Sequence, residues 1–191
     1  MTALDSLRQS VLTPAETLPL EGDKASAVLL AVVDRPGGPT LVMLEKAKGM
    51  RRHAGQIGFP GGGVEPGETS EEAAKREAWE EIGLAPEKIE VLGALDDDRT
   101  YVTSYHIRPL LAWVAEPPAQ WLADPVEVER VLELPLAEVV AAEPVSWLDF
   151  AILGMAFRAP RYHFADGTVV WGASARILKR FIDRVRPHWS P

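Results

Sequence analysis

The chain has 191 residues, and 28 acidic against 20 basic side chains give it a net charge of −8 at pH 7. An acidic chain argues against general nucleic-acid binding, which requires a basic surface. The absence of cysteine excludes disulfides, thiolate catalysis and cysteine-based zinc sites.

The ends and the longest apolar run give no targeting or membrane signal. Met1–Asp5 lacks the charged and apolar regions of a signal peptide. The longest apolar run, Ala25–Val33, is too short to cross a bilayer. We therefore expect one domain over residues 1–191 in a cytoplasmic protein with no membrane partner. Both a monomer and a homodimer are compatible with this sequence.

The first third of the chain predicts a helix followed by a hairpin. Leucine and valine at helical spacing predict a short amphipathic helix within residues 3–12. Two runs rich in Val and Leu, 25–34 and 40–46, flank the turn Arg35–Pro39, which is typical of a hairpin. Residues 47–57 are basic and contain glycine, so we expect a loop there, with at most a short turn of helix.

A second helix has signals at both of its ends. The three glycines 61–63 before it predict a turn. Thr69, with Glu72 three residues later, matches a capping box, so we expect a helix to begin there. The helix runs to about Ile82, and Gly83 occupies the position of a left-handed C-terminal glycine.

The rest of the chain predicts two strands, a short strand, a short helix, a hairpin and a closing amphipathic helix. Their ranges are 88–95, 105–114, 128–134, 135–141, 155–164 with 168–171, and 174–186. Because strands and helices mix without strict alternation, this order favours α+β layers over a doubly wound sheet.

The helix 69–82 carries the residues that suggest chemistry. Glu77, Glu80 and Glu81 stand at i, i+3 and i+4, which places them on one helix face. Carboxylates this close repel one another unless a cation lies between them, and hard oxygen ligands suit Mg²⁺ or Mn²⁺. The glycines 61–63 let backbone approach a ligand closely, so a carbonyl there could complete the coordination.

The alternative for the same helix is a solvated face without a metal. Glu72–Arg76 and Arg76–Glu80 are i,i+4 pairs that stabilise a helix by themselves. A second acidic cluster, Asp96–Asp98, stands at a strand end. It either adds a metal ligand or forms a solvated loop, and the solvated loop is the simpler interpretation.

The spacing from Gly62 onward distinguishes these alternatives. Gly62, five residues, Glu68, seven residues and then the run Arg76–Leu84 resemble the Nudix box; only Ala78 departs, being small where the pattern has a bulkier aliphatic residue. The box covers residues 62–84, and similarity in the flanking segments extends the resemblance to most of the chain. It implies an α/β/α sandwich around a mixed sheet, with helices at the two chain ends as extensions. It also implies metal-dependent hydrolysis of a diphosphate linkage in a small nucleotide-like substrate.

The resemblance also implies individual roles. Glu77 and Glu81 would be the principal metal ligands, and Glu80 a ligand or the group that orients or deprotonates water. The Gly62 carbonyl would also reach the metal. A divalent ion there would neutralise diphosphate oxygens, acidify a water and stabilise the leaving phosphate.

Two further catalytic candidates follow from the same resemblance. Arg76 would hold Glu68 or a neighbouring carboxylate in place. Some Nudix enzymes recruit a base from a loop comparable to the one that precedes Leu134, which makes Glu129 a candidate base.

The segment before the box resembles the coenzyme A diphosphatase branch of Nudix enzymes. The matching positions are Arg51, Gly55 and Phe59–Gly62. Two later stretches, Thr103–Tyr105 and Val169–Leu178, resemble further segments of that branch. The departure is the segment Val42–Ala47, which lacks the hydroxyl residues of the branch and has Lys46, a point cation, where the branch has the planar fork of arginine.

Cations just before a metal site would hold the phosphates of such a substrate. The candidate substrate contacts are Lys46, Arg51, Arg52, His53, Gly55 and Tyr105. We therefore expect hydrolysis of coenzyme A to phosphopantetheine and adenosine 3′,5′-bisphosphate. ADP-ribose or another dinucleotide is the alternative substrate, and a module that only senses a nucleotide is the alternative of a different class.

Overall fold

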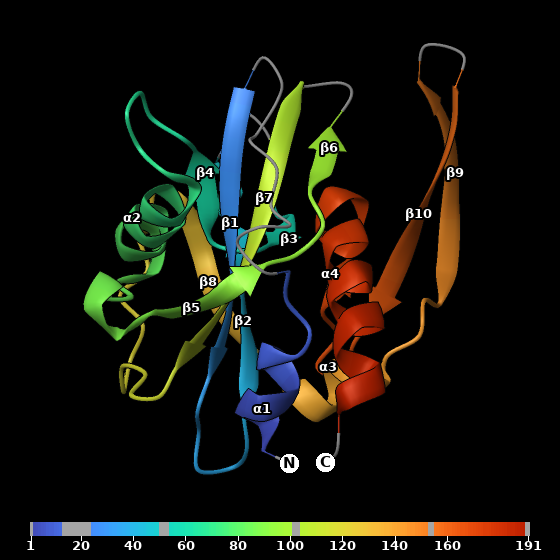
Figure 1. Cartoon of the computed structure of the whole chain (residues 1–191). Helices are drawn as coiled ribbons and strands as arrows, with labels where there is room; N and C mark the ends of the chain where they lie inside the picture. The colour runs from blue at the N-terminus through green and yellow to red at the C-terminus, as the bar shows by residue number, and fades with distance from the viewer. Residues whose placement is uncertain (1, 13–23, 50–53, 101–103, 153–154, 190–191) are drawn as a thin grey trace.

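A mixed β-sheet forms the centre of the molecule (Figure 1). The computed structural model describes residues 2–12, 24–49, 54–100, 104–152 and 155–189. The described strands of this sheet are β1 (Lys24–Val33), β2 (Thr40–Lys46), β3 (Ile57–Gly58), β4 (Gly61–Gly63), β5 (Glu90–Ala94), β6 (Asp98–Thr100), β7 (Tyr105–Val114) and β8 (Val128–Pro135). The main order is β3-β2-β1-β7-β5, while β4 pairs with β1, β6 with β7 and β8 with β2. β1 runs parallel to β7, and the other pairs are antiparallel.

Helices cover both faces of the sheet, so the expected α+β sandwich is confirmed. α2 (Ser70–Ile82) lies on one face, and α4 (Gly172–Val185) lies on the other (Figure 1). α1 (Ala3–Arg8) and α3 (Leu136–Ala141) share the α4 side of the core, and the short 3₁₀ helices Pro86–Lys88 and Arg186–His188 follow α2 and α4. Side chains of β1 alternate between the two faces, so Leu29 belongs to the α2 core and Leu30 to the α4 core.

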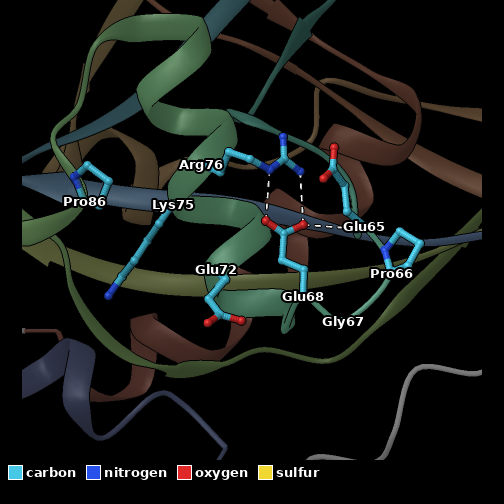
Figure 2. Close-up of a pocket in the computed structure, with 8 residues that line it drawn as sticks. All are labelled: Glu65, Pro66, Gly67, Glu68, Glu72, Lys75, Arg76 and Pro86. Atoms are coloured by element: carbon cyan, nitrogen blue, oxygen red, sulfur yellow. Dashed lines mark hydrogen bonds and ion pairs between the residues drawn. The ribbon is translucent and has the colours of Figure 1, made fainter.

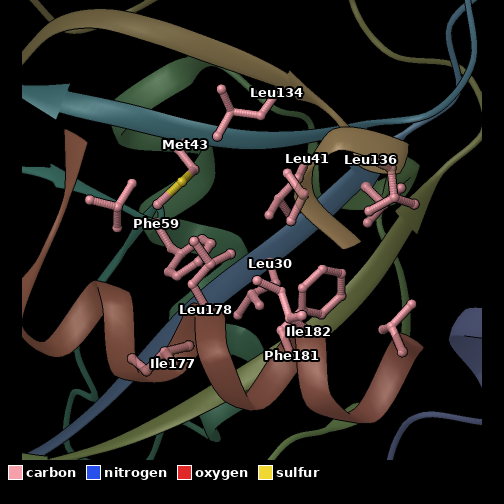
Figure 3. Packing of buried hydrophobic residues seen from close by; sticks show 14 of the residues in the cluster. Leu30, Leu41, Met43, Phe59, Leu134, Leu136, Ile177, Leu178, Phe181 and Ile182 are labelled. Atoms are coloured by element: carbon pink, nitrogen blue, oxygen red, sulfur yellow. The ribbon is translucent and has the colours of Figure 1, made fainter. Parts of the chain in front are cut away.

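The core under α4 is built from large aliphatic and aromatic side chains. Figure 3 shows Leu178, Phe181 and Ile182 of α4 beside Leu30 and Leu41 of the sheet. All of these side chains are fully or almost fully buried. Their spacing along α4 is that of an amphipathic helix, which is why the sequence alone predicted this element.

A second, small sheet lies beside α4. β9 (Ser146–Ile152) pairs with β10 (Met155–His163), and β10 pairs with β11 (Val169–Val170). The predicted hairpin around Asp166–Gly167 is therefore confirmed, whereas β9 was not predicted. In Figure 1 the β9–β10 pair runs past the end of α4. Among the described residues, none of the helices has the length and apolarity needed to cross a membrane.

The main local differences from the sequence predictions arise from tertiary contacts. The first helix ends at Arg8 because Leu12 has joined the sheet, where its N–H donates to Ala94 O at 2.8 Å. The glycines 61–63, predicted as a turn, form the strand β4 against β1. Within the expected loop 47–57, Ile57 already belongs to β3.

Candidate functional site

The helix α2 lies close against the sheet because its inward residues are small. Ala73, Ala74 and Ala78 are fully buried there. Thr69 and Glu72 form the predicted capping box at its start, and Gly83 ends it in the left-handed conformation with φ 69°. The small Ala78 brings the neighbouring acidic side chains up to β4.

Glu81 is a buried carboxylate with a defined partner on each oxygen. The residue is only 2% exposed. Its Oε2 accepts a hydrogen bond from Gly61 N at 3.0 Å, and its Oε1 accepts one from Lys46 Nζ. Burial raises the pKa of Glu81 above its usual value, although Lys46 and Gly61 act in the opposite direction. A carboxylate in this position needs a cation beside it to remain charged.

Glu77 fills the space that a side chain at Gly62 would take. A Cβ added to Gly62 would overlap the Glu77 carboxylate. Burial also raises the pKa of Glu77, and the contact with Arg76 opposes that effect. At Gly61 an added Cβ would overlap the backbone of Ala27 and Val28, whereas Gly63 has open space. Glycine is therefore required at positions 61 and 62, because neighbouring atoms lie too close for a side chain.

Arg76 links the loop before α2 to the acidic face of the helix. Its Nε and Nη2 donate to the two oxygens of Glu68 at 2.9 and 3.2 Å, and its Nη2 also donates to Gly63 O at 3.0 Å. Its Nη1 donates to Glu77 at 2.9 Å and to Glu80 at 3.1 Å. Hydrogen bonding to Arg76 lowers the pKa of Glu68. The predicted Glu72–Arg76 pair is replaced by the capping contact of Glu72 with Thr69.

Figure 2 shows the residues that line a surface pocket around the Arg76–Glu68 pair. The pocket has a volume of about 530 Å³. It is lined by Glu65, Pro66, Gly67, Glu68, Glu72, Lys75, Arg76 and Pro86. Three of its charged groups are already paired within the protein: Arg76 with Glu68, and Lys75 with Glu71 at 2.7 Å. Glu77 and Glu81 do not line this pocket, so it lies beside the acidic face and not on it.

The acidic face of α2 suits a hard divalent cation. Beside the glycine backbone, Glu81 supplies a buried carboxylate and Glu77 a partly buried one, and the Glu80 side chain is 56% exposed. Across the residues that the structure describes, no three acidic or histidine side chains already converge on one point. Instead, Glu81 contacts Lys46, while Glu77 and Glu80 share Nη1 of Arg76. Oxygen donors of this kind match Mg²⁺ or Mn²⁺.

The structure places the other predicted substrate contacts in different ways. Gly55 adopts a left-handed conformation with φ 69°, and its N–H donates to Lys46 O at 2.9 Å, which links it directly to Lys46. Tyr105 begins β7 and stands opposite Lys24 of β1, whose Nζ lies 5.5 Å from the centre of the tyrosine ring. Arg51, Arg52 and His53 lie outside the described residues.

Glu129 is the extra residue of a bulge in β8. Val128 stands opposite Lys46 and Arg130 stands opposite Glu45, so Glu129 has no partner position in β2. Its carboxylate is exposed and lies 3.9 Å from Lys48 Nζ.

The interpretation of Asp96–Asp98 as a solvated loop was wrong. All three carboxylates form ion pairs, with Arg184 for Asp96, Arg108 for Asp97, and Arg176 and Arg180 for Asp98. Asp98 is 3% exposed. The cluster therefore joins β6 and the segment before it to β7 and α4. Most of its partners lie far away in the sequence, so no local pattern could reveal them.

Comparison with known proteins gives one consistent result. The family model described as the NUDIX domain matches residues 23–164. Over 173 residues the chain is 35% identical to an uncharacterised Nudix hydrolase, NudL, of Salmonella paratyphi B. This alignment covers 90% of this chain and 88% of NudL. A MutT/nudix family protein from Enterococcus faecalis has a similar fold, with TM-score 0.56, 19% identity and coverage of 97% of this chain and 74% of that one. DR0079 from Deinococcus radiodurans aligns with TM-score 0.54 and 18% identity, over 86% of this chain and 88% of that one.

Proposed function

The chain belongs to the NUDIX domain family, whose hydrolases cleave pyrophosphate bonds in nucleoside diphosphate derivatives, and on this premise we propose that its substrate is coenzyme A. The products are phosphopantetheine and adenosine 3′,5′-bisphosphate. We propose Mg²⁺ or Mn²⁺ as the metal, held by Glu77, Glu80 and Glu81 with the carbonyl of Gly62.

The observation that supports the metal assignment is the buried carboxylate of Glu81, with the partly buried carboxylate of Glu77 near it, beside Gly61 and Gly62. Glu77 and Glu81 are both desolvated, and each already has a protein cation at one oxygen. Buried carboxylates without enough positive charge destabilise a fold, so their presence indicates a site built for more positive charge. When bound, a divalent ion would offset the charge of the diphosphate oxygens and lower the pKa of a water.

The residues of the chain then have separate tasks. The N–H of Gly61 fixes one oxygen of Glu81, and Arg76 holds Glu68 and Glu80 relative to the glycine backbone. Glu80 is the most exposed of the three acids, and Arg76 already binds its Oε2, so we assign the acceptance of a proton from the attacking water to its Oε1. Glu129 is the alternative base.

The proposal of coenzyme A depends on the segment before the box. Gly55 and the segment 59–62 match the coenzyme A branch, and the link from Gly55 to Lys46 places a cation beside Glu81. A cation at this point suits a substrate that presents several phosphates.

A substrate panel tests this proposal. Coenzyme A, ADP-ribose and diadenosine polyphosphates are incubated with Mg²⁺ or Mn²⁺, and the products are separated chromatographically. We expect the highest kcat/KM for coenzyme A, and equal or faster turnover of ADP-ribose would contradict it. Glu77→Gln and Glu81→Gln should abolish turnover with the fold intact. Glu71→Gln, an exposed acid on the same helix, is the matched control and should keep it.

A further inference from the structure

Backbone hydrogen bonds fix Lys46 at the end of β2. Its N–H donates to Gln56 O and its carbonyl accepts from Gly55 N, both at 2.9 Å. The register of β2 against β8 shifts between Glu45 and Lys46. Bulges of this kind redirect side chains and are frequent beside functional sites. Here the side chain of Lys46 lies on the α2 side of the sheet and contacts Glu81.

The two cations at the acidic face are held in different ways. Arg76 is anchored by a bidentate contact to Glu68 and by Gly63 O, so its guanidinium is fixed. Lys46 reaches Glu81 with the end of a flexible four-carbon stem, and its side chain is 19% exposed. Lys46 is therefore the cation that can move away from its carboxylate.

The contact of Lys46 with Glu81 occupies the oxygen that a metal ion would need. Glu81 Oε2 already accepts from Gly61 N, so Oε1 is the less engaged oxygen for an ion, and Lys46 Nζ donates to that oxygen. An ammonium and a divalent cation repel each other and cannot share this position.

We propose that Lys46 is a positioning residue whose ammonium stands in for the divalent ion at Glu81 and moves to the substrate's phosphates when the ion binds. This inference rests on the proposed function, because it requires a metal ion at Glu81. The exchange keeps the buried carboxylate neutralised in both states. The exchange also couples the binding of metal and substrate. Without substrate, the ammonium weakens the binding of the metal ion, whereas an anionic diphosphate that binds the ammonium strengthens the binding of the metal ion.

Mn²⁺ binding without substrate, at constant pH, is the test. Calorimetry or electron paramagnetic resonance measures the dissociation constant for wild type, Lys46→Met and Lys75→Met. The control removes a lysine that pairs with an exposed glutamate on α2, so it reproduces the change in net charge alone. We expect Lys46→Met to bind Mn²⁺ more tightly by about fivefold or more, a typical coupling magnitude, with little change in Lys75→Met.

Imidodiphosphate, a non-hydrolysable diphosphate, provides a second readout. It should tighten Mn²⁺ binding to wild type by a similar factor of about fivefold or more and tighten it much less in Lys46→Met. Should Lys46→Met fail to fold, Lys46→Gln replaces it, because the amide keeps a hydrogen bond to Glu81 without the charge.

The outcomes separate this inference from the function on which it rests. A wild-type protein that binds no Mn²⁺ overturns both the metal site and the role of Lys46. A wild-type protein that binds Mn²⁺, with Lys46→Met equal to it or weaker, overturns the role of Lys46 alone.

Discussion

Alanine at Gly62 should remove activity while leaving the fold almost unchanged. The added Cβ overlaps the carboxylate of Glu77, which is the end of a flexible side chain and can rotate away. We therefore expect a stability loss of about 1 kcal/mol or less. The same rotation takes Glu77 out of position, and displacing a catalytic group by ~1 Å costs on the order of 100-fold in rate.

The neighbouring glycines are matched controls for this substitution. At Gly61 the added Cβ overlaps backbone atoms of Ala27 and Val28, and φ is +150°. Overpacking costs about 1–3 kcal/mol and backbone strain about as much again, so we expect a loss of about 2–6 kcal/mol. At Gly63 nothing lies within 4 Å of the added atom. Gly63→Ala should change stability by no more than about 0.5 kcal/mol.

Thermal unfolding and steady-state kinetics together test this series. For a chain of this size each kcal/mol corresponds to about 2–4 °C in Tm, so Gly61→Ala is easily separated from the other two. Only Gly62→Ala should combine a nearly unchanged Tm with a large loss of kcat/KM and weakened Mn²⁺ binding. Full activity in folded Gly62→Ala would refute the inference that Glu77 must lie against this glycine.

Three other predictions concern charge. Burial raises the pKa of Glu77 and Glu81 above the ordinary value of 4.5, so the folded protein binds more protons than the unfolded chain in that range. With a chelator present, the Tm should therefore fall as pH rises above about 4.5. Saturating Mg²⁺ should reduce this fall, and an equal slope of Tm against pH with and without Mg²⁺ would contradict a metal ion at these two carboxylates. Glu68→Gln loosens Arg76 and should lower kcat/KM by about 10- to 100-fold at nearly unchanged Tm, whereas unchanged kinetics argue against a positioning role. Asp98→Asn weakens the contacts to α4 and should cost about 2 kcal/mol in chemical denaturation with KM unchanged, and an altered KM would link this cluster to the substrate site.

The elements that the sequence predicted well are those specified by local patterns. The helix 70–82 has its capping box and C-terminal glycine next to it in the chain, and its bounds agree with the prediction. The strand predicted at 105–114, which ends in the apolar run Leu110–Val114, has the same bounds in the structure. The acidic triplet Glu77, Glu80 and Glu81 follows from helical spacing alone, although in the structure Glu77 and Glu80 share Arg76 while Glu81 contacts Lys46.

The elements that the sequence did not reveal depend on partners far along the chain. Gly61–Gly63 is a strand only because β1 lies beside it, and Asp98 is buried only because α4 supplies arginines 78 or more residues later. The contact of Lys46 with Glu81 spans 35 residues.

The sequence by itself thus determined the helix, its caps, the spacing of its acids and the family to which the chain belongs, because each depends on residues within a few turns or on a fixed motif. Only the tertiary structure decided which acids are buried and which cation accompanies each one. Burial and ion pairing depend on what the folded sheet brings next to a side chain, and no periodicity within one segment encodes that neighbour.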